Sequence, residues 1–194
     1  MRNVTRRKFL ASSVLAALYG VSGAGAAQPP GQQSTPWRNW SGSVVANPAG
    51  RFSPSSEHQL ADFLASTRGQ LRPVGSGHSF TPLVPTEGRL LVLDQLTGLL
   101  SYDSSANTAS FAAGTRLSDM GAPLARIGQA AINLPDIDRQ TLAGATSTAT
   151  HGTGIDFKCL SGYVTELRLI TPSGEVHDLT NRSESGMFDA ARVG

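Results

Sequence analysis

The sequence is poor in cysteine and aromatic residues, and it has no acidic residue before Glu57. Cys159 is the single cysteine among 194 residues, so a disulfide within the chain is excluded. Aromatic residues make up 6% of the chain, whereas 21 glycines and 11 prolines predict many turns. Apolar residues nevertheless make up 39% and recur in short runs, which favours a folded domain over a disordered segment.

The positive formal charge of the chain is confined to its first residues. Arg2, Arg6, Arg7 and Lys8 are four of the 16 basic residues, which leaves 12 basic against 14 acidic residues elsewhere. The body is therefore slightly acidic, and nothing in its charge favours nucleic acid as a partner. No set of His, Cys, Asp and Glu has the spacing of metal ligands, so we expect no metal site.

The basic start belongs to a leader. Residues 1–27 read as a signal peptide, with an Ala-rich apolar run from Val14 to Val21 and small residues before position 28 that suit cleavage. Residues 5–10, Thr-Arg-Arg-Lys-Phe-Leu, resemble the twin-arginine export motif, a route for folded proteins that often carry a cofactor. The resemblance implies the twin-arginine export machinery as a partner and a periplasmic or extracellular location, with membrane association left open. The alternative is an ordinary secretion signal in which the two arginines occur by chance. Residues 28–36 read as a flexible linker.

The order of expected elements mixes strands and helices without strict alternation, which favours an α+β fold. For the first helix we expect Ser53 as N-cap, Pro54 at the first position and Gly69 as the stop. Pro123 should kink or shorten a second, amphipathic helix. The expected strands are 43–46, 71–74, 89–94 and 131–134, with hairpins at 99–103/108–113 and 164–171/175–179, and the amphipathic helix spans 117–127.

Two segments are candidates for binding chemistry. In the first, residues 72–80, Gly75 and Gly77 let backbone N–H groups turn toward an anionic ligand, and His78 stands among them as a nucleophile, base or ligand. A Rossmann fingerprint is excluded because Phe80 replaces its third glycine, and no Gly-Lys-Ser/Thr of a phosphate-binding P-loop follows. Taken alone, the segment is equally compatible with a tight turn and an incidental histidine.

The second segment, residues 141–154, has almost no bulky side chains and many hydroxyl groups. Such a composition suits close backbone approach to a flat or phosphorylated ligand. A polar loop, or a small-residue helix packed tightly on a sheet, is the alternative.

Taken together, the segments resemble the flavin-binding domain of the vanillyl-alcohol-oxidase superfamily, and within it the aldonolactone and alditol oxidase branch, which includes L-gulonolactone and D-arabinono-1,4-lactone oxidases. The resemblance covers residues 37–194 and implies an FAD-binding domain of the PCMH type, built from two small α/β lobes. It rests on Pro-Val-Gly-Ser-Gly-His-Ser-Phe at 73–80, Gln-Thr-Leu-Ala-Gly-Ala at 140–145, Ala-Thr-His-Gly-Thr-Gly at 149–154 and Leu-Ser-Gly-Tyr-Val-Thr-Glu-Leu-Arg-Leu-Ile-Thr at 160–171.

The resemblance also implies which residues hold FAD. His78 matches the family histidine that bonds covalently to the 8α carbon of the flavin, the loop 74–80 matches the pyrophosphate segment, and 141–152 matches the ribityl and isoalloxazine segment. Val74 and Phe80 are expected to be packing residues, and His151 to order its own loop. The implied cofactor-binding residues are Val74, Gly75, Ser76, Gly77, His78, Ser79, Phe80, Thr141, Gly144, Ala145, Thr148, Thr150 and Gly152.

For the activity, the resemblance implies an FAD-linked oxidase or dehydrogenase. A hydride would pass from an alcohol carbon of a sugar lactone or polyol to flavin, with oxygen or another electron acceptor as the second partner. Where the family continues into a further glycine-rich strand and a substrate domain, this chain stops, so we expect an incomplete FAD-binding domain with the substrate domain absent and no catalytic residue assigned.

Two other interpretations stay open. One is a truncated remnant or non-catalytic flavin-binding fragment. The other is a different reaction on the same fold, by a hydroxyacid dehydrogenase or a cell-wall-precursor reductase. The histidine at position 78 disfavours the reductases, which place asparagine there.

Overall fold

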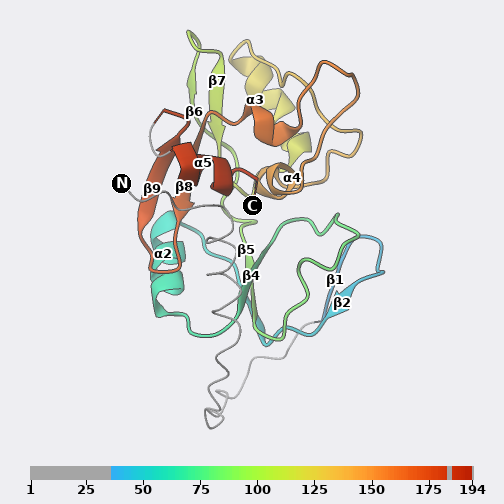
Figure 1. Cartoon of the computed structure of the whole chain (residues 1–194), viewed down its shortest axis with the longest axis vertical. Helices are drawn as coiled ribbons and strands as arrows, with labels where there is room; N and C mark the ends of the chain where they lie inside the picture. The colour runs from blue at the N-terminus through green and yellow to red at the C-terminus, as the bar shows by residue number, and fades with distance from the viewer. Residues whose placement is uncertain (1–35, 183–184, 194) are drawn as a thin grey trace. The chain divides into compact units, whose positions relative to one another are not determined.

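The computed structural model describes residues 36–182 and 185–193, all within one compact unit of the chain, Gln33–Gly194. The expected signal peptide, residues 1–27, lies outside the described residues, as does the expected linker except for its last residue. The elements in chain order, labelled in Figure 1, are β1 (Trp37–Arg38), β2 (Val45–Ala46), β3 (Gly50–Phe52), α2 (Glu57–Ser66), β4 (Leu71–Val74), β5 (Arg89–Val92), β6 (Leu99–Asp103), β7 (Thr108–Phe111), the 3-10 helix η1 (Leu117–Asp119), α3 (Gly121–Arg126), α4 (Leu142–Ser147), the 3-10 helix η2 (Leu160–Tyr163), β8 (Glu166–Ile170), β9 (Val176–Thr180) and α5 (Ser185–Ala191).

A three-stranded parallel sheet carries the first candidate segment. Its strand order is β3-β5-β4, so the later strand β5 lies between the two earlier ones. Leu90 of β5 is fully buried and packs in one cluster with Val74 of β4, Trp37 of β1 and Ala46 of β2. Because β4 ends at Val74, residues 75–80 leave the sheet at the carboxyl ends of its strands, where ligands commonly bind in parallel sheets.

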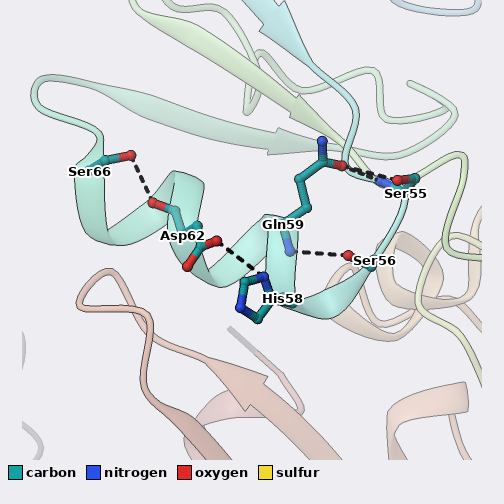
Figure 2. Close-up of polar contacts among 6 residues, drawn as sticks. All are labelled: Ser55, Ser56, His58, Gln59, Asp62 and Ser66. Carbon is teal, nitrogen blue, oxygen red and sulfur yellow. Dashed lines mark hydrogen bonds and ion pairs between the residues drawn. The ribbon is translucent and has the colours of Figure 1, made fainter.

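Helix α2 begins three residues later than the sequence suggested. Ser56, not Ser53, is the N-cap, and its side chain accepts a hydrogen bond from the Gln59 N–H at 3.1 Å, while Gln59 Oε1 accepts from the Ser55 N–H at 2.7 Å (Figure 2). The first bond satisfies an N–H group that the first turn leaves free, and the second holds the residue before the cap against the helix. Ser53 instead hydrogen-bonds the Asp94 carboxylate, and its carbonyl accepts from Gln95.

The far end of α2 also differs from the expectation. The helix ends at Ser66 with Thr67 as its C-cap, before the expected stop at Gly69, because the Thr67 hydroxyl and N–H both close onto the Phe63 carbonyl. Along its exposed side, His58 lies 3.1 Å from the Asp62 carboxylate (Figure 2). Phe63 stacks on Phe52 with ring centroids 3.8 Å apart, which packs α2 against β3.

Both expected hairpins are present. β6 pairs antiparallel with β7, and β8 with β9. The β8–β9 turn lies beside α2 in Figure 1, and a Cβ added at Gly174 in that turn would lie 2.8 Å from the Ala61 carbonyl oxygen. Arg168 of β8 joins the same two elements, because its guanidinium lies 2.6 Å from the Asp178 carboxylate and 3.3 Å from that of Glu57.

The stretch between the hairpins is less regular than expected. The amphipathic helix predicted over 117–127 is divided into η1 and α3, in agreement with the expected effect of Pro123. The strand predicted at 131–134 does not form. Asn133 there donates its side-chain amide to the Thr153 carbonyl at 3.1 Å, so the segment supports the second candidate segment and has no strand partner.

The α+β class is confirmed. No helix in the described part of the chain is long and apolar enough to cross a membrane. Within residues 36–182 and 185–193, no three His, Cys, Asp or Glu side chains gather as a metal site would require.

Candidate functional site

The two candidate segments meet at Gly75 and Thr141. A Cβ added to Gly75 would overlap the Thr141 hydroxyl, so only glycine lets the first loop approach the start of α4 this closely. A Cβ on Gly144 would lie 3.0 Å from the same hydroxyl. The structure therefore brings together two glycine-containing segments that lie far apart in the sequence.

The first loop is held from its other side by residues 37–40. Gly77 has a positive φ of +68°, which favours glycine, and a Cβ there would lie 3.2 Å from the Trp37 ring. The Trp40 N–H donates to the Gly77 carbonyl at 2.8 Å. Asn39 is 3% exposed, and its side-chain amide donates to the Ser79 carbonyl at 3.1 Å while its oxygen accepts from the Val44 N–H. The β1–β2 hairpin thus fixes the backbone of residues 77–79.

Ser76 is the unsatisfied group of this loop. Its Oγ is buried and has no hydrogen-bond partner among the described residues. An unpaired buried hydroxyl costs about 1–3 kcal/mol, and such an orphan in a native fold points to a missing polar partner. A ligand oxygen placed against the loop would satisfy it.

His78 is half-buried, and its ring stacks on that of Trp40 with centroids 5.4 Å apart and planes 21° from parallel. Burial, and next the positive charge of Arg116, lower the pKa of His78 below its ordinary value of 6.5. The imidazole is therefore neutral at neutral pH, which leaves one ring nitrogen with a free lone pair. A nucleophilic histidine needs this state.

The flanking residues of the loop differ in burial. Val74 is 8% exposed and packs in the core, as expected. Phe80 is 68% exposed, so the expectation that it is a packing residue is wrong. The chain has already left the sheet at this point, and the ring lies nearly perpendicular to that of Trp40, with centroids 6.2 Å apart. The Ser79 hydroxyl accepts from the Thr81 N–H at 3.2 Å and closes the loop.

The second segment forms the short helix α4 and a following turn, so the small-residue helix is the arrangement observed for its first part. The Leu142 and Ala143 N–H groups donate to the Thr115 and Ala113 carbonyls, which anchors the start of the helix. Ala145 is fully buried and accepts from the Thr150 N–H at 3.2 Å through its carbonyl. Its place in the fold is in the packed interior of the segment.

The turn after α4 is ordered by hydroxyl groups and close backbone contacts. Thr148 donates to the Gly144 carbonyl at 2.9 Å, and Thr150 accepts from the Gln140 amide at 3.1 Å. A Cβ on Gly152 would overlap the Leu134 carbonyl and the Asn133 side chain. His151 is exposed, and its Nδ1 lies 2.8 Å from the Gly152 carbonyl oxygen, so it orders its own loop as expected.

Sequence reasoning missed Asn39, Trp40, Arg116 and Asn133. Trp37 and Trp40 are the only two tryptophans in the chain and stand close together, a concentration that could have drawn attention to them. Arg116 carries no such signal, because its position opposite Thr141 in an isolated β-bridge is a tertiary fact.

Several known proteins are similar to this chain. The family model described as an FAD-binding domain matches residues 48–180. L-gulono-1,4-lactone dehydrogenase of Mycobacterium tuberculosis is 41% identical over 160 residues, covering 81% of this chain and 37% of that protein. L-gulonolactone oxidase of Bos taurus is 29% identical over 84% of this chain and 38% of that protein. D-arabinono-1,4-lactone oxidase of Eremothecium gossypii is 31% identical over 81% of this chain and 31% of that protein.

The chain thus spans about a third of the length of these relatives. Among solved structures, Physcomitrella patens BBE-like 1 superposes with a TM-score of 0.67 at 21% identity, over 75% of this chain and 33% of that one. Cholesterol oxidase from B. sterolicum gives 0.63 at 21% identity, over 81% and 35%. At such identities these two neighbours establish a shared fold.

Proposed function

The chain belongs to the FAD-binding domain family, and from this premise we propose that it forms the flavin-binding part of an oxidoreductase acting on the alcohol group of a sugar-derived lactone or polyol. The names of the relatives, a lactone dehydrogenase and two lactone oxidases, support the lactone part of this substrate class. Oxygen or another acceptor would take up the electrons. We also propose that the chain is exported by the twin-arginine route, on the motif at residues 5–10.

The observation that carries the proposal is the junction of the two glycine-containing segments beside an unsatisfied buried hydroxyl. Gly75 admits the Thr141 side chain, and the Ser76 Oγ lacks a partner that a polar ligand would supply. These features fit a dinucleotide whose pyrophosphate accepts N–H and O–H donors from the loop 75–79. Thr148, Thr150 and the close turn at Gly152 would line the sugar-alcohol chain and the ring system.

FAD, when bound, would supply the two-electron redox chemistry that side chains lack. The residues of this chain would bind and orient it. Residues 75–79 would hold the negative charge of the pyrophosphate, and the Arg116 guanidinium would add a positive charge beside His78. Water would be kept from part of the site by the Trp40 and Phe80 rings, which contact each other over the loop.

We propose in addition that His78 carries the flavin covalently. The neutral imidazole favoured by burial and by Arg116 has the lone pair that such a bond requires. Such a bond would join a ring nitrogen of His78 to the 8α carbon; the hydrogens of the imidazole N–H and of one methyl C–H would leave as two protons, and an acceptor such as dioxygen would take the two electrons.

The test uses protein purified with FAD. The expected result is a flavin absorbance spectrum, together with yellow colour that stays with the protein after acid precipitation and a peptide containing His78 that gains the mass of FAD. His78→Ala should lose the acid-stable fraction and keep reversible FAD binding. Folded protein that takes up no FAD would overturn the proposal, whereas FAD released entirely by acid would overturn only the covalent link.

The substrate class is tested separately by turnover. L-gulono-1,4-lactone, D-arabinono-1,4-lactone and a polyol are offered with dioxygen or an artificial acceptor, and flavin bleaching under anaerobic conditions reports reduction. Bleaching by a lactone or polyol supports the assignment. Bleaching by a 2-hydroxy acid alone would favour the hydroxyacid dehydrogenase alternative.

A further inference from the structure

Trp40 is a large apolar side chain in an unusual position. It is 65% exposed, so it contributes little to the core, yet its ring contacts the rings of two residues of the candidate loop. The indole stacks on His78 at 5.4 Å and meets the edge of Phe80 at 6.2 Å. Its contacts with two residues of the loop suggest that Trp40 acts in the site.

The backbone of Trp40 is held against the candidate loop. The Trp40 N–H donates to the Gly77 carbonyl at 2.8 Å, one residue before His78. The preceding residue, Asn39, is buried and bonds the Ser79 carbonyl, one residue after His78. Trp40 and His78 are therefore tied to each other by backbone contacts on both sides of the histidine.

The imidazole itself has little else to orient it. Among the described residues, no side chain or backbone group hydrogen-bonds to either ring nitrogen of His78. The charge that lowers its pKa is that of Arg116, a cation that cannot accept a hydrogen bond. An imidazole without a hydrogen bond rotates readily about its terminal side-chain torsion. The stack on Trp40 is the contact that restricts this rotation.

We propose that Trp40 is a positioning residue for His78: its indole fixes the plane of the imidazole, so that a ring nitrogen points out of the loop toward the flavin and attachment is accelerated. The inference rests on the covalent link proposed above, the bond between a ring nitrogen and the 8α carbon, with dioxygen or another acceptor taking the two electrons. Trp40 forms no bond in that step and acts through His78.

The first test measures the rate at which acid-stable flavin appears after flavin-free protein is mixed with FAD. Trp40→Leu removes the flat ring and should slow attachment about 10-fold or more, because misorientation of a reacting group has effects of that size. Total bound FAD is measured in parallel, and the attachment rate is compared at saturating FAD, so that a change in affinity does not count as a change in rate. Trp40→Phe keeps a flat ring and should restore most of the rate.

Tyr102→Leu is the matched control, because it removes another exposed aromatic ring, in β6, and should leave the rate unchanged. An attachment rate in Trp40→Leu equal to that of the wild type, with FAD bound, would overturn the positioning role. A parallel loss of total FAD binding and of Tm in Trp40→Leu, not rescued by Trp40→Phe, would assign Trp40 to folding and would also overturn it.

The second test needs no flavin. A protonated imidazole quenches a stacked indole, so tryptophan fluorescence of flavin-free protein should fall when His78 takes up a proton. His78→Gln should abolish this step, and Trp40→Phe should abolish it while leaving the emission of Trp37. If the wild type shows this fall in fluorescence but forms no acid-stable flavin, the covalent link and its acceleration are overturned. If the wild type shows no fall in fluorescence, the stack of Trp40 on His78 is overturned.

Discussion

The Thr141 hydroxyl fills the space into which a Cβ on Gly75 would project. This relationship joins the end of β4 to the start of α4, and with them the two segments proposed to hold FAD. Gly75 and Thr141 belong to different elements that lie far apart in the sequence. Substitution of either residue therefore tests the tertiary contact between them.

Gly75→Ala should weaken FAD binding and lower stability by about 1–3 kcal/mol, because the added methyl group must push the two segments apart. FAD affinity is measured by quenching of flavin fluorescence, and stability by thermal unfolding. Gly121→Ala is the control, since a Cβ there has open space. The double variant Gly75→Ala/Thr141→Ala removes the obstructing hydroxyl and should regain part of the stability; strict additivity of the two changes would contradict the contact.

Ser76→Ala should weaken FAD binding without lowering the stability of the flavin-free protein. Removal of an unsatisfied buried hydroxyl should leave the flavin-free protein equally stable or more stable, by up to about 1–3 kcal/mol. FAD affinity should drop about 3- to 10-fold, the value of one lost hydrogen bond. Paired measurements of Tm and Kd check this, with the exposed Ser110→Ala as control; a lower Tm and an unchanged Kd would show that the Ser76 hydroxyl serves the fold and not the ligand.

The lowered pKa of His78 predicts a pH-dependent stability. Above the unfolded-state value of 6.5 both states are neutral at this position and the histidine has no effect. As the pH falls below 6.5, the unfolded chain binds the proton first, so stability is lost until the pH passes the lower folded pKa. The Tm of flavin-free wild type minus that of His78→Gln should therefore decrease between pH 7 and pH 5. A difference that increases over this range would reverse the assigned direction, and His151→Gln controls for loss of an exposed imidazole.

Asn39→Ala should destabilise the fold by about 1–3 kcal/mol, because it leaves the Ser79 carbonyl and the Val44 N–H without their partner. In a domain of this size, 1 kcal/mol corresponds to about 2–4 °C in Tm. FAD binding should weaken too, since the loop 77–79 loses its support. The exposed Asn47→Ala should change neither quantity, and an unaltered Tm in Asn39→Ala would contradict the role of the buried amide.

The export proposal concerns the leader. Replacing both Arg6 and Arg7 by lysine keeps the charge and should abolish twin-arginine transport, so the protein stays in the cytoplasm with its leader attached. Cell fractionation and immunoblotting measure the distribution. Continued export of the doubly substituted protein would favour an ordinary secretion signal.

Local pattern predicted most of the regular elements, because hairpins and short apolar strands depend on neighbouring residues. The strands at 71–74 and 99–103 occur as expected, since alternation and turn residues fix them locally. The start of α2 was misplaced because Pro54 favoured Ser53 as the cap, whereas the Ser-x-x-Gln pattern at 56–59 and the contact of Ser53 with Asp94 select Ser56. The expected strand at 131–134 does not form, because its apolar residues have no partner strand.

The sequence predicted the two segments of the candidate site but not the contacts between them. Glycine spacing indicated the loop around His78, since close backbone approach requires residues without side chains. The Trp40 stack, the Arg116 charge and the junction of Gly75 with Thr141 arise when distant segments pack together. No periodicity or motif within either segment encodes them.

The strand order β3-β5-β4 also dictates a sequence of events during synthesis. Strands β3 and β4 are made before β5, the strand with which both of them pair. They therefore have no partner in this sheet until residues 89–92 have emerged from the ribosome. The contact between Gly75 and Thr141 can form only after residue 141 has also been synthesised. The two segments proposed to hold FAD are both present only once residue 152 has emerged, so we expect cofactor loading to follow synthesis of at least the first 152 residues.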